Sequence, residues 1–286
     1  MLLAILASCV LLFPGGQKSH KTAGVVEVAA ASDLHPDRYE QFPVYDARDE
    51  RALLQLTNRD RERNGLAPLQ LEPGLTAAAR AHAARMAQRD ELSHQLAGEP
   101  ALQDRLTVTS LHLDRAGENV SLSTTIDRAH DGLMHSPHHR DNILSQGFNV
   151  VGLGVARIGD RIYVVEDFGH NLPMVPAQQA EDLVAATLLK TRSQHSSADL
   201  KRVAVANLHD AACAMAAADK VNAKSAGGLG NVRFVLTYTN MQPDVLPSNV
   251  AQVLGDKSVR SFAVGACYAN TQTYPNGAYF VTLAFY

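Results

Sequence analysis

The chain has 286 residues, of which 46% are hydrophobic, and a formal net charge of −3 at pH 7. This length and composition exclude a globally disordered chain and allow one large domain or two ordinary ones. Its 26 Lys and Arg residues are outnumbered by 29 Asp and Glu residues and are spread along the chain, so the sequence predicts no nucleic-acid partner.

Residues 1–24 begin with an apolar run, MLLAILASCVLLF, of about 13 residues. Such a run is too short to span a bilayer comfortably and is typical of an export signal. We therefore predict a signal-like or anchor segment and a secreted or extracytoplasmic protein, in the periplasm or at the cell surface. Membrane contact is expected only through this segment, if it stays uncleaved. A lipoprotein-like stretch, Leu6–Cys9, leaves lipid anchoring open beside signal cleavage.

Residues 25–46 contain Pro36 and Pro43 without sustained periodicity, which predicts a linker. A half-buried helix is expected over 51–64, and a second from Pro73, at a first helical position, to Arg89. His82 falls on the apolar stripe of this second helix, so we interpret it as a packing residue.

The next predicted elements are a helix over 125–134 and a short helix that ends at Leu144. Ser136 is expected to be the N-cap of the short helix, because Pro137 follows at its first position. Two strand-like runs, 150–157 and 161–168, are joined by Ile158, Gly159 and Asp160 and predict a hairpin.

Residues 177–286 predict a smaller α+β region that ends in an antiparallel hairpin. Helices are expected over 179–191, 199–220 and 248–254, and a strand over 232–239. The terminal strands can be laid on those of the first hairpin, VVGLGVAR on AVGACYAN and IYVVEDF on YFVTLAF. Either a degenerate repeat or convergent hairpin chemistry explains this match. Cys213 and Cys267 predict either a disulfide or two buried thiols.

Several short motifs fall in a characteristic order between Leu54 and His170. They are NRDRERNGLAPLQLEPGLTAAARAHAARMA, Ser93–His94, QDRL at 103–106, AGENVS at 116–121, SPHHRDNIL at 136–144, VGLGVAR and YVVEDFG. In this set the chain resembles the CAP superfamily of cysteine-rich secretory, antigen and pathogenesis-related proteins (SCP-like), most closely its bacterial secreted members. The resemblance implies an α-β-α sandwich over residues 47–172.

The resemblance also implies a cleft with two histidines and acidic residues that bind zinc or another divalent metal in several members. By position these are His94, His139 and Glu118, and we add Ser136 and Asn119 as cleft residues. The metal ligands would be His94 and His139, because neutral imidazole nitrogens suit zinc. Ser136 stands where other members have a second Glu, and the chain has no Trp. Glu166 is a candidate to replace that acid.

Three functional hypotheses follow. The favoured one is an exported binding module whose cleft takes a lipid, a glycan or a protein, with a divalent metal as an additional element. The alternative is a zinc-dependent hydrolase that uses His94, His139 and Glu118, with Glu118 as general base. The third is a purely structural hydrogen-bonded network. A serine nucleophile is not predicted, because G-x-S-x-G is absent from the sequence.

Overall fold

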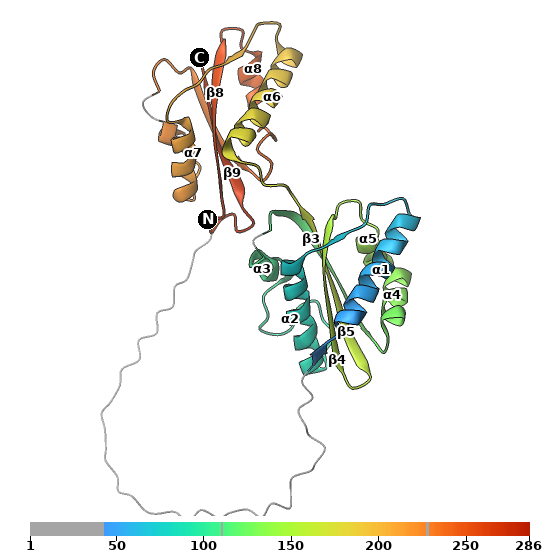
Figure 1. The fold of residues 1–286 in the computed structure, drawn as a ribbon. Helices are drawn as coiled ribbons and strands as arrows, with labels where there is room; N and C mark the ends of the chain where they lie inside the picture. The colour runs from blue at the N-terminus through green and yellow to red at the C-terminus, as the bar shows by residue number, and fades with distance from the viewer. Residues whose placement is uncertain (1–42, 110, 227–228) are drawn as a thin grey trace, which may run out of the picture. The chain divides into compact units, whose positions relative to one another are not determined.

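The computed structural model describes residues 43–109, 111–226 and 229–286. The predicted signal or anchor segment (1–24), most of the predicted linker and the lipoprotein-like Cys9 lie outside the described residues. Within the described ranges, no helix is both long and apolar enough to cross a membrane. Two α/β sandwiches follow one another along the chain, and each has its own sheet (Figure 1).

The first sandwich contains five helices. They are α1 (Ala47–Arg63), α2 (Pro73–Arg89), α3 (Leu102–Thr107), α4 (Ile126–His135) and α5 (Pro137–Ile143). Helix α1 begins at Asp46, whose carboxylate accepts hydrogen bonds from the backbone N–H groups of Arg48 and Asp49. The predicted start of α2 at Pro73 is confirmed, and Glu72 caps it through the Leu75 N–H. Ser136 precedes α5 as predicted, but its side chain makes no capping hydrogen bond to the described chain.

The first sheet has strands β1 (Val44–Tyr45), β2 (Gln70–Leu71), β3 (Leu113–Ser123), β4 (Val150–Ile158) and β5 (Arg161–Asn171). Its order is β1-β4-β5-β3, with β2 pairing parallel to β4. The β4–β5 hairpin is confirmed, whereas β3 was not predicted. Val44 and Tyr45, which lie within the predicted linker, pair with β4.

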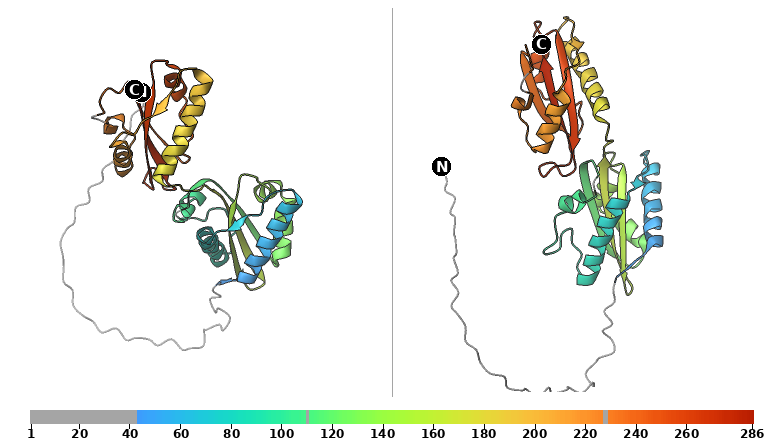
Figure 2. Two further views of the ribbon diagram at one scale, coloured as in Figure 1. Left: turned by 45° about the horizontal axis from the view of Figure 1, so that its top comes forward. Right: turned by 60° about the vertical axis from the view of Figure 1, so that its left-hand side comes forward.

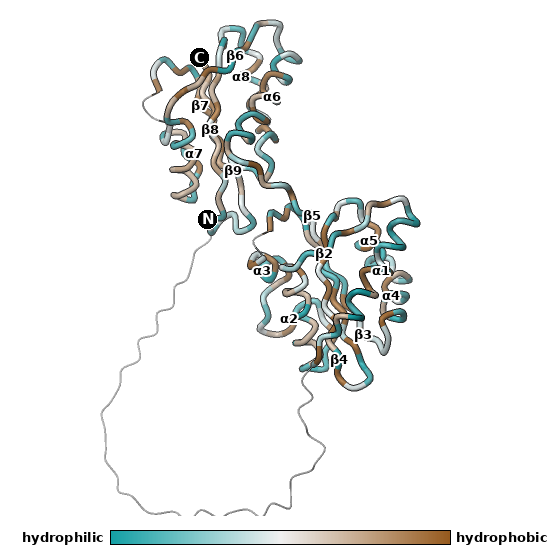
Figure 3. Tube along the Cα trace, in the orientation of Figure 1, coloured by the Kyte–Doolittle hydropathy of each residue, from teal (hydrophilic) through white to brown (hydrophobic). Residues whose placement is uncertain are grey.

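Helices cover both faces of this sheet, as Figures 1 and 2 show. One face packs against α2 through Ala79, Ala83 and Met86, and the other packs against α1 and α4. Figure 3 shows hydrophobic residues concentrated on the strands between these layers. Helix α2 lies close to the sheet because Gly154 has no side chain: a Cβ there would lie 2.4 Å from the Ala79 carbonyl carbon. The predicted α-β-α sandwich is therefore the observed fold.

The second sandwich contains helices α6 (Ala177–His195), α7 (Leu208–Ala217) and α8 (Val250–Gly255), and a short 3₁₀ helix η1 (Ala223–Ala226). Its strands are β6 (Lys201–Arg202), β7 (Phe234–Asn240), β8 (Ser261–Ala269) and β9 (Ala278–Phe285). The helix expected over 199–220 is wrong in its first half. Lys201 and Arg202 pair with β8, and Asn207 has a left-handed φ of 72° directly before α7.

The second sheet has the pairing pattern of the first. Its order is β6-β8-β9-β7, and the short strand β6 pairs parallel to β8 as β2 pairs parallel to β4. Val150 and Ser261 occupy equivalent positions, since they pair with Gln70 and Lys201 at the starts of the two short strands. For the first strand of each hairpin this register differs by two residues from the alignment suggested by the sequence, whereas the second strands keep the suggested alignment of IYVVEDF on YFVTLAF. The domain limits 47–172 and 177–286 and their relation as a repeat stay predictions.

A buried arginine occupies the same place in each sandwich. Arg61 donates to the carbonyls of Ala67, Ile143, Ser145 and Phe148. Arg192 donates to those of Ala198, Leu254, Asp256 and Val259. Each arginine therefore ties the end of the first helix of its sandwich to the segment before its second long strand, β4 or β8. We call the two residues the arginine hubs.

The two cysteines of the second sandwich form a disulfide, which joins α7 to β8 across a sequence separation of 54 residues. Of the two alternatives left open by the sequence, the structure contains the bonded pair.

Candidate functional site

The predicted residues His94, Glu118 and His139 come together at the edge strand β3. Glu118 lies on β3, His94 lies on the loop after α2, and His139 lies on α5. His94 Nδ1 is 2.8 Å from Glu118 Oε1. The ring centroids of His94 and His139 are 6.4 Å apart. We call these two residues the histidine pair.

The two members of the histidine pair differ in their exposure to solvent. The His94 side chain is 59% exposed, whereas His139 is partly buried. Burial lowers the pKa of His139, and the charges of His94 and His138 lower it further. The neutral imidazole, which can accept a hydrogen bond or ligate a metal, is thereby favoured at His139.

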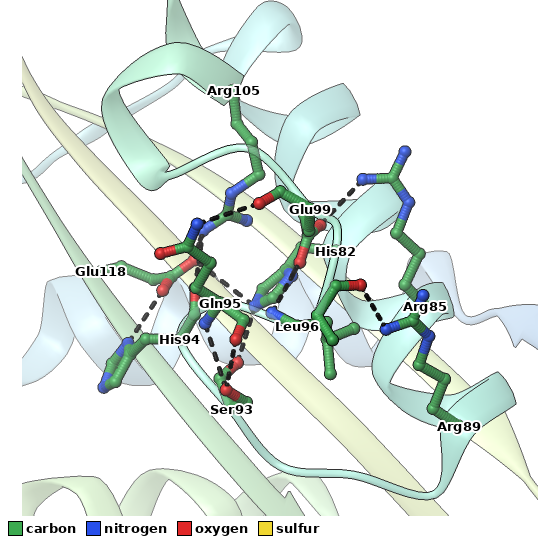
Figure 4. Close-up of polar contacts among 11 residues, drawn as sticks. His82, Arg85, Arg89, Ser93, His94, Gln95, Leu96, Glu99, Arg105 and Glu118 are labelled. Atoms are coloured by element: carbon green, nitrogen blue, oxygen red, sulfur yellow. Dashed lines mark hydrogen bonds and ion pairs between the residues drawn. The ribbon is translucent and has the colours of Figure 1, made fainter. Parts of the chain in front are cut away.

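Glu118 lies beneath the histidine pair and is 7% exposed. Its Oε2 atom accepts a hydrogen bond from Arg105 Nη2 at 2.5 Å, and Oε1 faces His94. Figure 4 shows Arg105 reaching from α3 to this carboxylate, with His82 close by. Both oxygens of Glu118 therefore have a nitrogen partner, and the negative charge is balanced within the protein.

His82 is fully buried on α2 and joins the same group of charges. Its Nε2 is 2.9 Å from the Ser93 carbonyl oxygen and 3.8 Å from Glu118 Oε2. Its Nδ1 is 2.8 Å from Glu99 Oε2. Both ring nitrogens thus lie near oxygen atoms, although only Nε2 has hydrogen-bond geometry among the described residues. The interpretation of His82 as a packing residue therefore omits its polar role.

Glu99 lies between buried His82 and Arg85, whose side chain is half exposed. Burial acts to raise its pKa, but the hydrogen bond from Arg85 and the contact with His82 outweigh it, so that the pKa is lowered overall. Arg85 Nη1 lies 2.9 Å from Glu99 Oε1. A continuous row of ionisable side chains thus runs from His94 through Glu118, His82 and Glu99 to Arg85. We call it the charged row.

Asp167 on β5 lies directly opposite Glu118 in the sheet and is fully buried. Neither of its carboxyl oxygens has a conventional donor among the described residues. Burial, and next the charge of Glu118, raise the pKa of Asp167 well above its ordinary value. Asp167 therefore keeps its proton at pH values where a surface aspartate is ionised.

Asn119 holds α5 against the sheet. Its Nδ2 donates to the His139 carbonyl at 3.1 Å and to Glu166 Oε2 at 2.9 Å, while Thr57 donates to Glu166 Oε1 at 3.0 Å. Burial raises the pKa of Glu166, and these hydrogen bonds oppose the shift. Glu166 lies on the α1 side of the sheet, away from Glu118, so the expectation that it replaces the missing acid is wrong.

Sequence comparison assigns a family to this region. Residues 54–168 match the family described as "CAP: Cysteine-rich secretory protein family". Residues 54–168 are a CAP domain. The family resemblance of the motifs is thereby confirmed.

Relatives of the CAP domain include two curated proteins of Bacillus subtilis (strain 168). The uncharacterized protein YkwD is 31% identical over 111 residues, which cover 38% of this chain and 43% of YkwD. The uncharacterized membrane protein YlbC is 28% identical over 130 residues, which cover 45% of this chain and 36% of YlbC. The matches thus span less than half the length of each relative.

A solved structure is also similar to the CAP domain, an extracellular protein containing an SCP domain from Bacillus anthracis str. Ames. Its sequence identity is 27% and its TM-score 0.40, and the match covers 43% of this chain and 40% of that chain.

The donor set of the CAP domain does not fit a catalytic zinc centre. Among residues 43–109, 111–226 and 229–286, no three His, Cys, Asp or Glu side chains are grouped so as to hold a metal ion. The histidine pair alone offers two nitrogen ligands, whereas catalytic zinc usually has three protein ligands. Ser136 lies next to the pair in sequence and is partly buried. Its role and that of Asn119 as binding residues stay predictions.

A hollow of about 370 Å³ lies on the other side of the charged row, between α2 and α3. Ala77, Ala78 and Ala81 line its apolar part, and His82 and Arg105 contribute its polar part. Arg105, Glu99 and Asp167 are not among the site residues predicted from the sequence. Arg105 lies within the QDRL motif, and Asp167 follows Glu166 on the opposite strand face, which are the two signals that point to them.

Proposed function

We propose that this chain is an exported CAP-domain binding module that engages a polar ligand through the histidine pair. The observation that carries the proposal is the contact between Glu118 and His94 Nδ1, at 2.8 Å. Because this contact occupies Nδ1, only Nε2 of His94 is left to meet a ligand, beside the ring of His139.

The fixed charges beneath the pair support binding rather than chemistry. Each oxygen of Glu118 already has a nitrogen partner, His94 or Arg105, so the carboxylate has a positioning role in this arrangement. The geometry gives no specific support to the alternative of a zinc-dependent hydrolase with Glu118 as general base.

The chemistry of the pair favours a glycan or a polar protein segment over a lipid. Two imidazole rings exchange hydrogen bonds with hydroxyl and amide groups, and the His94 side chain is 59% exposed to such a ligand.

A divalent ion such as zinc is a further part of the proposal. His94 and His139 would hold it, and Glu118 would orient the His94 ring, as carboxylates do for metal-bound histidines. A bound ion would supply a Lewis-acidic contact to ligand oxygens. The residues fit a two-histidine site of modest affinity and not a closed structural site.

Export is proposed from two observations. The apolar run at the start of the sequence is typical of a signal, and the related Bacillus anthracis protein is described as extracellular.

The metal part of the proposal can be tested by calorimetric titration of the metal-free chain with Zn²⁺. Wild type should bind one ion, and His94→Ala or His139→Ala should each weaken binding at least tenfold. Glu118→Gln should weaken it about tenfold, the lower end of the range for a residue that orients a ligand. His135→Ala is the matched control, because His135 lies four residues before His139 but is 78% exposed and bonds only to Asp131.

The ligand part needs a separate measurement by NMR. Soluble N-acetylglucosamine oligosaccharides, added to chain labelled at histidine, should shift the His94 and His139 resonances, whereas phosphatidylcholine vesicles should not. Shifts with vesicles alone would contradict the polar ligand class. Equal responses in wild type and in the His94→Ala, His139→Ala double variant would contradict the site.

A further inference from the structure

A carboxylate, an imidazole and a disulfide lie in a row on the second sandwich. His209 and Cys213 are one turn apart on α7, and His209 Nε2 lies 3.6 Å from Cys213 Sγ. His209 Nδ1 lies 2.9 Å from the carbonyl oxygen of Ala266 and 3.7 Å from Glu181 Oε1. Cys213 is bonded to Cys267 on β8.

The contacts of His209 fix the position of its proton. A carbonyl oxygen can only accept, so Nδ1 carries the hydrogen in the neutral ring. The lone pair of Nε2 then faces the Cys213 sulfur. If Nε2 takes up a proton, the nearby Glu181 carboxylate, whose side chain is only 12% exposed, stabilises the resulting imidazolium.

The row is accessible from solvent. The His209 side chain is 52% exposed, and Cys213 and Cys267 are both partly exposed. A small thiol can therefore reach the disulfide, which is unlike a disulfide enclosed in a core.

The row also belongs to the second sandwich alone. Gly154 faces Ala79 and Arg80 as Gly265 faces Leu208 and His209, which makes Arg80 the counterpart of His209. In the CAP domain the corresponding carboxylate, Glu50, forms an ion pair with Arg80 at 2.5 Å. At this position the second sandwich thus has a titratable nitrogen beside a disulfide, where the first sandwich has a permanent cation.

We propose that Cys213–Cys267 is a redox-active disulfide that exchanges with external dithiols, with His209 stabilising Cys213 as the leaving sulfur. The thiolate of the dithiol attacks Cys267 Sγ, and the bond between the two cysteine sulfurs breaks. Its electron pair stays on Cys213 Sγ as a thiolate, which pairs with His209 once Nε2 has taken up the proton released by the attacking thiol. The second thiol of the reductant gives its proton to water and attacks its own linked sulfur in the mixed disulfide, breaking the bond to Cys267 Sγ. The oxidised reductant leaves, and the Cys267 thiolate takes a proton from water.

The equilibrium test uses the full chain in dithiothreitol redox buffers of graded ratio, with the reduced fraction read by alkylation and mass spectrometry. His209→Ala should shift the equilibrium toward the disulfide by about tenfold, because the thiolate loses its counter-ion. His195→Ala is the matched control, since His195 is also an exposed histidine bonded to a backbone carbonyl but contacts no described sulfur. An equilibrium that changes less than twofold in His209→Ala would overturn the proposal.

A kinetic test examines each thiol separately. In Cys267→Ser, the rate of iodoacetamide alkylation of Cys213 should rise with pH about a unit or more below the ordinary thiol midpoint of about 8.5. Adding His209→Ala should restore the ordinary midpoint, and Cys267 in Cys213→Ser should show it throughout. An ordinary midpoint for Cys213, including one caused by loss of the fold on reduction, as read by circular dichroism, would refute the role of His209.

Discussion

The two sandwiches share a strand order and an arginine hub but differ in what they bury around the sheet. The strand registers and the glycine contacts show which residues of the two sandwiches are equivalent. The buried polar residues of the CAP domain include His82, Glu118, Asn119, Glu166 and Asp167. Their equivalents in the second sandwich are, in the same order, Ala211, Val235, Leu236, Leu283 and Ala284. The CAP domain thus has a row of buried charges where the second sandwich has an apolar interior.

This difference shows which interior residues the fold requires: an apolar interior is sufficient, and the buried charges are not needed. Buried charges cost desolvation energy, and well-packed apolar residues in their place are often neutral or stabilising. Because the second sandwich keeps the topology with apolar residues, the charges of the CAP domain are not needed to form the sheet. Their cost is explained better by a function at the histidine pair than by stability.

The largest effect is expected from removing the arginine hubs. Arg61→Met and Arg192→Met should each lower the free energy of unfolding by about 3–4 kcal/mol, because each leaves four carbonyl acceptors without their charged donor. Urea unfolding of both variants measures this, with the exposed Arg63→Met as control, for which a change within about 0.5 kcal/mol is expected. A large loss for only one hub would break the equivalence of the two sandwiches.

The next effect concerns the close approach of helix and strand. Gly154→Ala and Gly265→Ala should each cost about 1–3 kcal/mol, since the new Cβ would lie 2.4 Å and 2.2 Å from carbonyl carbons of α2 and α7. Thermal unfolding checks the values. Gly132→Ala serves as control, because a Cβ there meets no described atom within 4 Å inside α4, and it should stabilise by up to about 1 kcal/mol.

The buried carboxyl of Asp167 should give the CAP domain a pH dependence that Ala284 cannot give the second sandwich. The pKa of Asp167 is raised in the folded state, so between its unfolded value and its folded value the folded chain binds more protons. Stability should therefore fall with rising pH in that window, by about 1.4 kcal/mol per pH unit at most.

Asp167→Asn should remove this fall. Urea unfolding from pH 4 upward would show wild type losing stability relative to the variant as the pH rises. Parallel curves for the two proteins would mean that Asp167 is ionised in the folded state.

The smallest effect on stability is expected when one residue of the second sandwich is replaced by its equivalent from the CAP domain. Thr282 is fully buried, and its hydroxyl has no hydrogen-bond partner among the described residues. The equivalent residue on β5 is Val165. Thr282→Val should stabilise the chain by about 1 kcal/mol, because it removes an unsatisfied buried hydroxyl. Differential scanning calorimetry measures this change, and a loss of stability would indicate an unseen partner for the hydroxyl.

The sequence predicted the elements that carry strong periodicity and missed those held by tertiary contacts. Helix α2 and the β4–β5 hairpin have clear apolar patterns and were found. Strand β3 reads LDRAGENVSLS, with three charged side chains among its first six residues, and its pairing with β5 decides its conformation. Helix α7 was extended too far because tertiary pairing of Lys201 and Arg202 overrides local propensity.

The candidate site was predicted in part for a similar reason. His94, Glu118 and His139 lie in short motifs and were found through the family resemblance. Arg105, Glu99 and Asp167 complete the charge balance from three different elements. Their mutual contacts depend on the packing of α3 and the loop after α2, which no local pattern encodes.

The arginine hubs recognise only main-chain carbonyls. Every residue type offers that oxygen, so the residues that a hub holds can be exchanged without loss of the contact. The contacts of an arginine hub thus do not depend on which side chains its neighbours carry. Nearly all the side chains of a sandwich could therefore be substituted while this contact and the fold are kept. A buried arginine at the end of the first helix is thus a useful marker for distant copies of this fold.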